Sequence, residues 1–127
     1  MELNEFVDRL CQRILQYIES GQKPGKLVEY VPADSLSKTS DIHLPLEGRG
    51  TEAVFDDIDE FLRKSVKTNR AEFMNPLWGG LNTTGFAGEV ITALTNTSMY
   101  TYELAPFATL IEQTILKRMG EPVSYTH

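Results

Sequence analysis

Four segments of the chain carry apolar residues at the three- and four-residue spacing of an amphipathic α-helix, and this pattern constrains the fold most. The first runs from about residue 3 to residue 20, and its stripe contains Phe6, Val7, Leu10, Ile14 and Ile18. The other three cover about residues 51–67, 84–95 and 105–119. Because an amphipathic helix is stabilised mainly by packing its apolar face, each stripe needs a covering surface. We therefore predict an all-α chain whose helices pack on one another or lie on a larger body.

Residues 22–50, between the first two predicted helices, lack this periodicity. They contain three prolines, Pro24, Pro32 and Pro45, and several glycines. Pro and Gly interrupt regular structure, so we expect a long irregular connection that wraps around another part of the protein. His43 stands alone between two apolar residues in this segment and is expected to be structural.

Charge and composition exclude several classes of protein. The net charge of −6 argues against a nucleic-acid surface, which needs clustered Lys and Arg side chains. The single cysteine, Cys11, excludes an intrachain disulfide, and its apolar neighbours favour a small buried residue. No apolar run reaches the roughly 20 residues of a membrane span. The acidic amino-terminus is unlike a secretory signal, so we expect a cytoplasmic protein that binds neither membrane nor nucleic acid.

The run of residues 56–60, Asp-Asp-Ile-Asp-Glu, is the main acidic cluster. Carboxylates are favoured near the N-terminus of a helix, where the backbone dipole is positive. The run lacks the ligand spacing of a calcium-binding loop. We therefore expect a solvated helix face and no metal site.

Residues 74–106 contain no His, Cys, Lys, Arg or Asp, yet they are dense in Gly, Pro, Asn, Thr and aromatic residues. These types shape a pocket wall but supply no nucleophile–base pair or phosphate-binding loop. Two quoted runs stand out, "FMNPLWGGLN" at 73–82 and "NTSMYTYELAP" at 96–106. The second is followed by an apolar helix ending in "LKRMG".

These runs closely resemble the amino-terminal part of the group II pyridoxal-phosphate-dependent amino-acid decarboxylases. That family includes the glutamate, cysteine-sulfinate, aspartate and aromatic amino-acid decarboxylases. Its sequence pattern in this region reads approximately FFNQLxxGLD, then NTxx[FY]TYEx[AS]P, and then a helix that ends near KxM. The matching positions here are Phe73, Asn75, Leu77, Gly80, Leu81, Asn96, Thr97, Tyr100, Thr101, Tyr102, Glu103, Ala105, Pro106, Glu112, Leu116, Lys117 and Met119. The runs "VEYVPADSL" and "LPLEGRGTEAVFDDI" extend the resemblance over nearly the whole chain.

The chain departs from the family pattern in three places. It has Arg70-Ala71-Glu72 where the family usually has His-Pro before the first block. Pro76 replaces the Gln of the glutamate-type enzymes, and Trp78 replaces a small residue. The family positions line the substrate pocket, so the substrate of this chain cannot be copied from one branch.

The resemblance also implies that residues 1–127 are one part of a larger enzyme. Family chains run to several hundred residues, and their cofactor lysine lies far downstream next to a histidine. None of the lysines here follows a histidine; they are Lys23, Lys26, Lys38, Lys64, Lys67 and Lys117. We therefore expect the amino-terminal helical segment of a fold-type I enzyme, without the large pyridoxal-phosphate domain. The expected activity of the full-length protein is that of a carboxy-lyase in amino-acid metabolism, and the chain alone is expected to be inactive and to bind no cofactor.

The resemblance assigns this segment a role in shaping the pocket and in forming a homodimer. It implies substrate contacts at Asn75, Pro76, Leu77, Trp78 and Gly79. It places Ser98, Met99 and Tyr100 in the pocket of the neighbouring subunit, and implies no catalytic, cofactor-binding or metal residue in this chain. The residues around Tyr100 favour an acidic amino acid as substrate. Two alternatives remain: a free-standing interaction module that pairs with a full-length decarboxylase, and a self-contained helical bundle without a ligand.

Overall fold

A computed structural model of the chain describes residues 1–123, which contain helices and connecting segments but no strand. The chain divides into two compact units, the first formed by residues 1–81 and the second beginning at Asn82. The expectation of an all-helical segment is confirmed.

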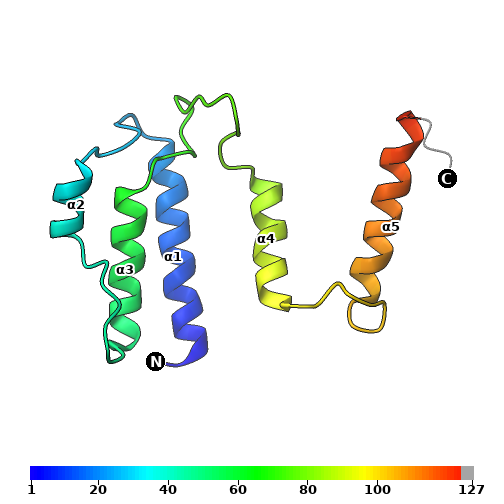
Figure 1. The fold of residues 1–127 in the computed structure, drawn as a ribbon, viewed down its shortest axis with the longest axis horizontal. Helices are drawn as coiled ribbons and strands as arrows, with labels where there is room; N and C mark the ends of the chain where they lie inside the picture. Colours follow the sequence, from blue (N-terminus) through cyan, green and yellow to red (C-terminus); the bar gives the residue numbers. More distant parts are fainter. Residues whose placement is uncertain (124–127) are drawn as a thin grey trace. The chain divides into compact units, whose positions relative to one another are not determined.

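Two helices of the first unit, α1 (Leu3–Gly21) and α3 (Gly50–Lys64), lie side by side and run in the same direction (Figure 1). The ring of Phe55 in α3 is completely buried between them. The Phe6 ring lies 4.8 Å from it, centroid to centroid. The guanidinium groups of Arg9 and Arg13 lie 4.2 and 4.4 Å from its centroid. An aromatic side chain sandwiched by a second ring and two cations therefore forms the centre of this unit.

The same two arginines also form ion pairs from α1 to α3. Arg9 donates to both carboxylate oxygens of Glu52, at 2.6 and 2.7 Å. Arg13 donates to both oxygens of Asp59, at 2.8 and 3.0 Å. Two-pronged pairing of this kind fixes geometry as well as adding attraction. The Arg9 hydrogen bond lowers the pKa of Glu52 below its ordinary value, because it stabilises the ionised carboxylate.

The connection between α1 and α3 must return the chain along the length of α1, since the two helices are parallel. It contains a further helix, α2 (Ala33–Thr39), where a wholly irregular segment was expected. Pro32 is its N-cap residue. At the far end, α3 stops at Lys64, before the expected residue 67, because Ser65 adopts an extended conformation. The missed helix is short and carries one large apolar residue, Leu36, so it leaves no periodic signal.

Residues 65–81 contain no helix and return to the end of α1. The Lys67 amide donates to the Leu27 carbonyl at 2.7 Å. The Asn69 side-chain amide donates to the Tyr17 carbonyl at 2.8 Å. Gly21 makes this approach possible, since a Cβ atom there would lie 2.3 Å from Asn69 Nδ2. These contacts fix the start of the segment that carries the predicted substrate loop.

The second unit contains α4 (Thr83–Thr95), α5 (Pro106–Gly120) and a 3₁₀ turn at Glu121–Val123. Asn82 caps α4, because its Oδ1 accepts from the Gly85 amide at 2.7 Å. At the other end Asn96 adopts a left-handed conformation, φ 43°, which terminates the helix. Pro106 occupies the first turn of α5, where its missing N–H is not needed.

Large apolar side chains are widely exposed in both units, and few residues are buried. Phe55 and Ala105 are the buried hydrophobic residues of the described chain. Phe61 is 72% exposed although it belongs to the apolar stripe of α3. Cys11 is exposed as well, so the expectation that it is buried is wrong: α3 covers only one face of α1. Among residues 1–123, no helix combines the length and apolar character needed to cross a membrane.

Candidate functional site

The predicted substrate loop, Asn75–Gly79, is a turn held by its own side chains. The Asn75 Oδ1 atom accepts from the Leu77 amide at 2.8 Å, which closes an Asx-type turn around Pro76. Leu77 is 84% exposed. Trp78 is half exposed and its indole lies 6.0 Å from the Phe73 ring, with the planes tilted by 41°. The turn therefore presents apolar side chains on a backbone whose conformation is locally fixed.

The two glycines that end this loop differ in the space around them. A Cβ atom at Gly80 would lie 2.3 Å from the Thr68 carbonyl oxygen. A Cβ atom at Gly79 would meet nothing within 4 Å. Gly80 thus allows the backbone of the loop to pass close to residue 68, whereas Gly79 is surrounded by open space.

The second predicted group, Ser98, Met99 and Tyr100, lies on the connection between α4 and α5. The Ser98 Oγ atom accepts from the Tyr100 amide at 3.4 Å, and the Tyr100 side chain is 89% exposed. Met99 lines a cavity of about 510 Å³ formed between the end of α4 and the start of α5. The apolar part of its lining includes Ile91, Leu104, Pro106, Phe107 and Ile111. Because the two predicted loops belong to different units, the structure gives the geometry of each separately.

The connection after Tyr100 is a compact turn. The Thr101 carbonyl accepts from the Leu104 and Ala105 amides at 3.2 and 3.1 Å. Ala105 is buried at this point. The pKa of Glu103 is lowered because its own backbone N–H and the Thr101 hydroxyl favour the ionised carboxylate. This turn sets the direction in which α5 leaves the loop.

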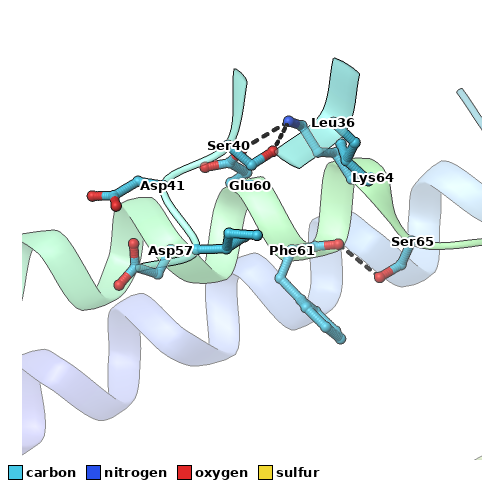
Figure 2. A pocket seen from close by; sticks show the side chains of 9 residues that line it. Leu36, Ser40, Asp41, Asp57, Glu60, Phe61, Lys64 and Ser65 are labelled. Atoms are coloured by element: carbon cyan, nitrogen blue, oxygen red, sulfur yellow. Dashed lines mark hydrogen bonds and ion pairs between the residues drawn. The ribbon is translucent and has the colours of Figure 1, made fainter. Parts of the chain in front are cut away.

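A cavity of about 360 Å³ that the sequence pattern did not indicate lies between α3 and residues 36–42 (Figure 2). Its apolar lining comes from Leu36, Ile42 and Phe61. On one side the Lys64 ammonium pairs with Glu60 at 2.8 Å and donates to the Ser40 hydroxyl. The Lys64 and Ser40 contacts lower the pKa of Glu60. No spacing in residues 22–50 predicts the cavity, because it depends on α2.

The acidic run at residues 56–60 is paired with cations, not simply solvated. Asp57 accepts from Arg49 at 2.6 Å, Asp59 from Arg13, and Glu60 pairs with Lys64. Within residues 1–123, no cluster of three His, Cys, Asp or Glu side chains is arranged to hold a metal ion. Of these pairs, Asp59–Arg13 joins α3 to α1, whereas Asp57–Arg49 lies at the start of α3 and Glu60–Lys64 lies within it.

The two lysines nearest to these features are also engaged. Lys64 is bound to Glu60 and Ser40, as described above. The Lys67 ammonium lies 4.6 Å from the centroid of the Tyr17 ring and donates to the Leu62 carbonyl. Burial lowers the pKa of Lys67. Both ammonium groups are therefore engaged by neighbouring groups of the first unit.

Residues 32–126 match the model of the pyridoxal-dependent decarboxylase conserved domain. The chain belongs to this family. Its match covers α2 to α5 and includes both predicted loops, so the resemblance inferred from the sequence is confirmed.

Curated relatives of this decarboxylase segment are similar over most of its length. Acidic amino acid decarboxylase GADL1 of Mus musculus is 30% identical over 95% of the chain. Glutamate decarboxylase of Drosophila melanogaster is 28% identical over 98%, and cysteine sulfinic acid decarboxylase of Rattus norvegicus is 35% identical over 79%. The chain spans 22%, 25% and 20% of the length of these three proteins, respectively.

Proposed function

We propose that the whole protein is a pyridoxal-phosphate-dependent carboxy-lyase that removes CO₂ from an amino acid, and that this chain is its pocket-lining and dimerisation segment. The observation that carries the proposal is the family match over residues 32–126. Three curated relatives named as decarboxylases support it. The cofactor supplies the electron sink for this chemistry. Its binding residues are assigned to the part of the protein outside this chain.

The role proposed for Asn75–Gly79 is to form an apolar wall beside the substrate. Pro76 has a fixed φ, and the Asn75 side chain closes the turn on the Leu77 amide. Trp78 then offers a large rigid surface with a single N–H donor. A wall of this kind excludes water and limits the orientations that a substrate can adopt. These residues need no acid–base function of their own.

The substrate proposed is an acidic amino acid. The relatives that support this choice are named for acidic amino acids, glutamate and cysteine sulfinic acid. Residues 74–106 contain no Lys or Arg, so a cation that binds the second acidic group must come from elsewhere. Trp78 and Pro76 would then set the size and shape of the pocket.

Assembly as a homodimer in the cytoplasm completes the proposal. Many apolar side chains of α4 and α5 are exposed, including Leu94 at 77% and Phe107 at 76%. Exposed apolar area of this extent is characteristic of surfaces that are covered in an assembly. We propose that the loop bearing Ser98, Met99 and Tyr100 then reaches the pocket of the second subunit.

The test is to assay the complete gene product, loaded with pyridoxal phosphate, for CO₂ release from L-glutamate, L-aspartate, L-cysteine sulfinate and an aromatic amino acid. Trp78→Ala should change the ratio of kcat/KM between substrates by about tenfold or more, the scale of a lost pocket contact. Tyr100→Ala should lower kcat/KM, and Tyr30→Ala is the matched control because Tyr30 is 82% exposed outside both loops. Absence of CO₂ release from every amino acid would refute the function. Equal effects of Tyr100→Ala and Tyr30→Ala would refute the site.

The interaction-module alternative is favoured by the same exposed side chains. It requires that the 127-residue chain, purified alone, forms a stable complex with a purified full-length decarboxylase of the family. Size-exclusion chromatography of the mixture decides between the two. A complex that Phe107→Ser and Leu94→Ser abolish supports the module, and two separate peaks exclude it.

A further inference from the structure

Arg70 is the buried charged residue of the described chain. Its side chain is 5% exposed, although arginine is seldom buried without a matched partner. It lies in the segment between α3 and the predicted substrate loop, five residues before Asn75. In the sequence, this position differs from its surroundings only in departing from the family pattern.

One edge of the Arg70 guanidinium has no hydrogen-bond partner in residues 1–123. The unpaired atoms are Nε and Nη2. These two N–H groups point the same way and form the fork that binds both oxygens of a carboxylate. The nearest carboxylate is that of Glu72, whose Oε2 lies 3.5 Å from Nε without forming a hydrogen bond. Glu72 is itself 60% exposed, so it does not close the site.

The position of Arg70 is fixed by the chain around it. Its amide donates to the Lys67 carbonyl at 3.2 Å, and its carbonyl accepts from the Phe73 amide at 3.0 Å. Gly25 makes room for the guanidinium, since a Cβ atom at that position would lie 3.1 Å from Nη1. The neighbouring Asn69 is held by its bond to the Tyr17 carbonyl. These contacts hold the backbone around Arg70, so the Nε–Nη2 edge is positioned before a ligand binds.

We propose that Arg70 is a carboxylate-binding residue whose Nε–Nη2 edge takes both oxygens of an acidic group that residues 1–123 do not supply. Burying a cation whose N–H groups make no hydrogen bonds costs free energy, and binding an anion at those groups would offset this cost. A planar carboxylate satisfies both donors at once. We expect Glu72 to move aside when an anion binds, because its side chain is 60% exposed and makes no hydrogen bond to Arg70.

Two sources of the carboxylate share this chemistry. One is a free dicarboxylic molecule, and the other is an Asp or Glu side chain from another part of the protein. The proposal does not depend on decarboxylation, because it concerns binding at Arg70 alone. A failure of the proposed activity would leave it standing, and its own failure would leave the activity standing.

The experiment follows the arginine Nε–H signals of the 127-residue chain by NMR while glutarate or N-acetyl-glutamic acid α-amide is added. Arg13 is an internal control, because its Nε already donates to Asp59 at 2.8 Å. We expect the Arg70 signal to move saturably and the Arg13 signal to stay. Preference for glutarate identifies a free dicarboxylate, and preference for the blocked glutamate identifies a protein side chain.

Three variants separate the site from general charge effects. Arg70→Gln should weaken carboxylate binding by about tenfold or more, as expected for loss of charged hydrogen bonds. Arg70→Lys should also weaken it, because an ammonium keeps the charge but lacks the fork. Glu72→Gln should strengthen binding or leave it unchanged. The proposal is overturned if the Arg70 signal does not respond, if the response does not saturate, or if Glu72→Gln destabilises the unit as much as Arg70→Gln does. If the Arg13 Nε–H signal has the chemical shift of an unfolded chain, the unit is not folded and the preformed fork does not exist, so the proposal is overturned as well.

Discussion

Replacing Phe55 with Ala should separate α1 from α3. Phe55 is the fully buried large side chain of its unit, at 0% exposure. It contacts the Phe6 ring and both cross-helix arginines. No other side chain of α3 is buried, so no neighbour can replace its contribution.

The size of the effect follows from this burial. Truncating a buried Phe to Ala costs about 3–5 kcal/mol in protein cores. The lower end applies here, about 3 kcal/mol, because the outer faces of both helices are open and the site can partly collapse. Whole domains are stable by only about 5–15 kcal/mol. A unit with a single buried large apolar side chain among its described residues lies well below that range, so we expect Phe55→Ala to unfold it.

The assay is amide hydrogen exchange of the whole chain, with α4 and α5 as an internal reference. Protection of α1 and α3 should fall to the level of an unfolded segment, while protection of α4 and α5 stays as in the parent chain. Phe61→Ala is the matched control, since Phe61 lies on the same helix and is 72% exposed. We expect it to cost less than about 1 kcal/mol. The reasoning fails if the two variants lose protection equally, or if Phe55→Ala leaves α1 and α3 protected.

Three other outcomes are expected. Arg9 lowers the pKa of Glu52 in the folded chain, so the ionised Glu52 side chain stabilises the α1–α3 pair above its ordinary pKa of 4.5. This stabilisation is lost as the pH falls through the lowered, folded-state pKa. Glu52→Gln should therefore make the stability of the α1–α3 pair less dependent on pH below pH 5, as measured by circular dichroism. Gly80→Ala should distort the predicted substrate loop because its Cβ would meet the Thr68 carbonyl, whereas Gly79→Ala should be tolerated; equal chemical-shift changes in both variants would contradict this. Asn82→Ala should cost α4 about 1 kcal/mol by removing its cap, seen as faster exchange of the first-turn amides.

Periodicity predicted the helix-rich character of the chain because long apolar stripes are a direct record of helix faces. It failed for α2, whose seven residues carry a single large apolar side chain. It also failed for burial. Cys11 lies beside an apolar stripe and Phe61 lies within one, yet both side chains are exposed. An apolar stripe indicates that a helix face must be covered, but it does not indicate which part of the protein covers it.

The candidate site was less accessible to sequence reasoning than the fold. The loop at Asn75–Gly79 was predicted to contact substrate through a family resemblance alone, and the structure adds the turn that the Asn75 side chain closes. Arg70 could not be recognised as a buried cation, since its burial depends on contacts with Gly25, far away in the sequence. The cation pairing of the acidic run was likewise hidden, because Arg13 and Asp59 are 46 residues apart.

The sandwich around Phe55 also has a consequence for the order of events during synthesis. Its members, Phe6, Arg9, Arg13 and Phe55, together with Glu52 and Asp59, all lie within the first 64 residues. A nascent chain therefore contains every residue of this cluster before the predicted substrate loop has been translated. Because chains are made from the amino-terminus and early units fold first, we expect α1 and α3 to pair before residues 65–81 complete the first unit.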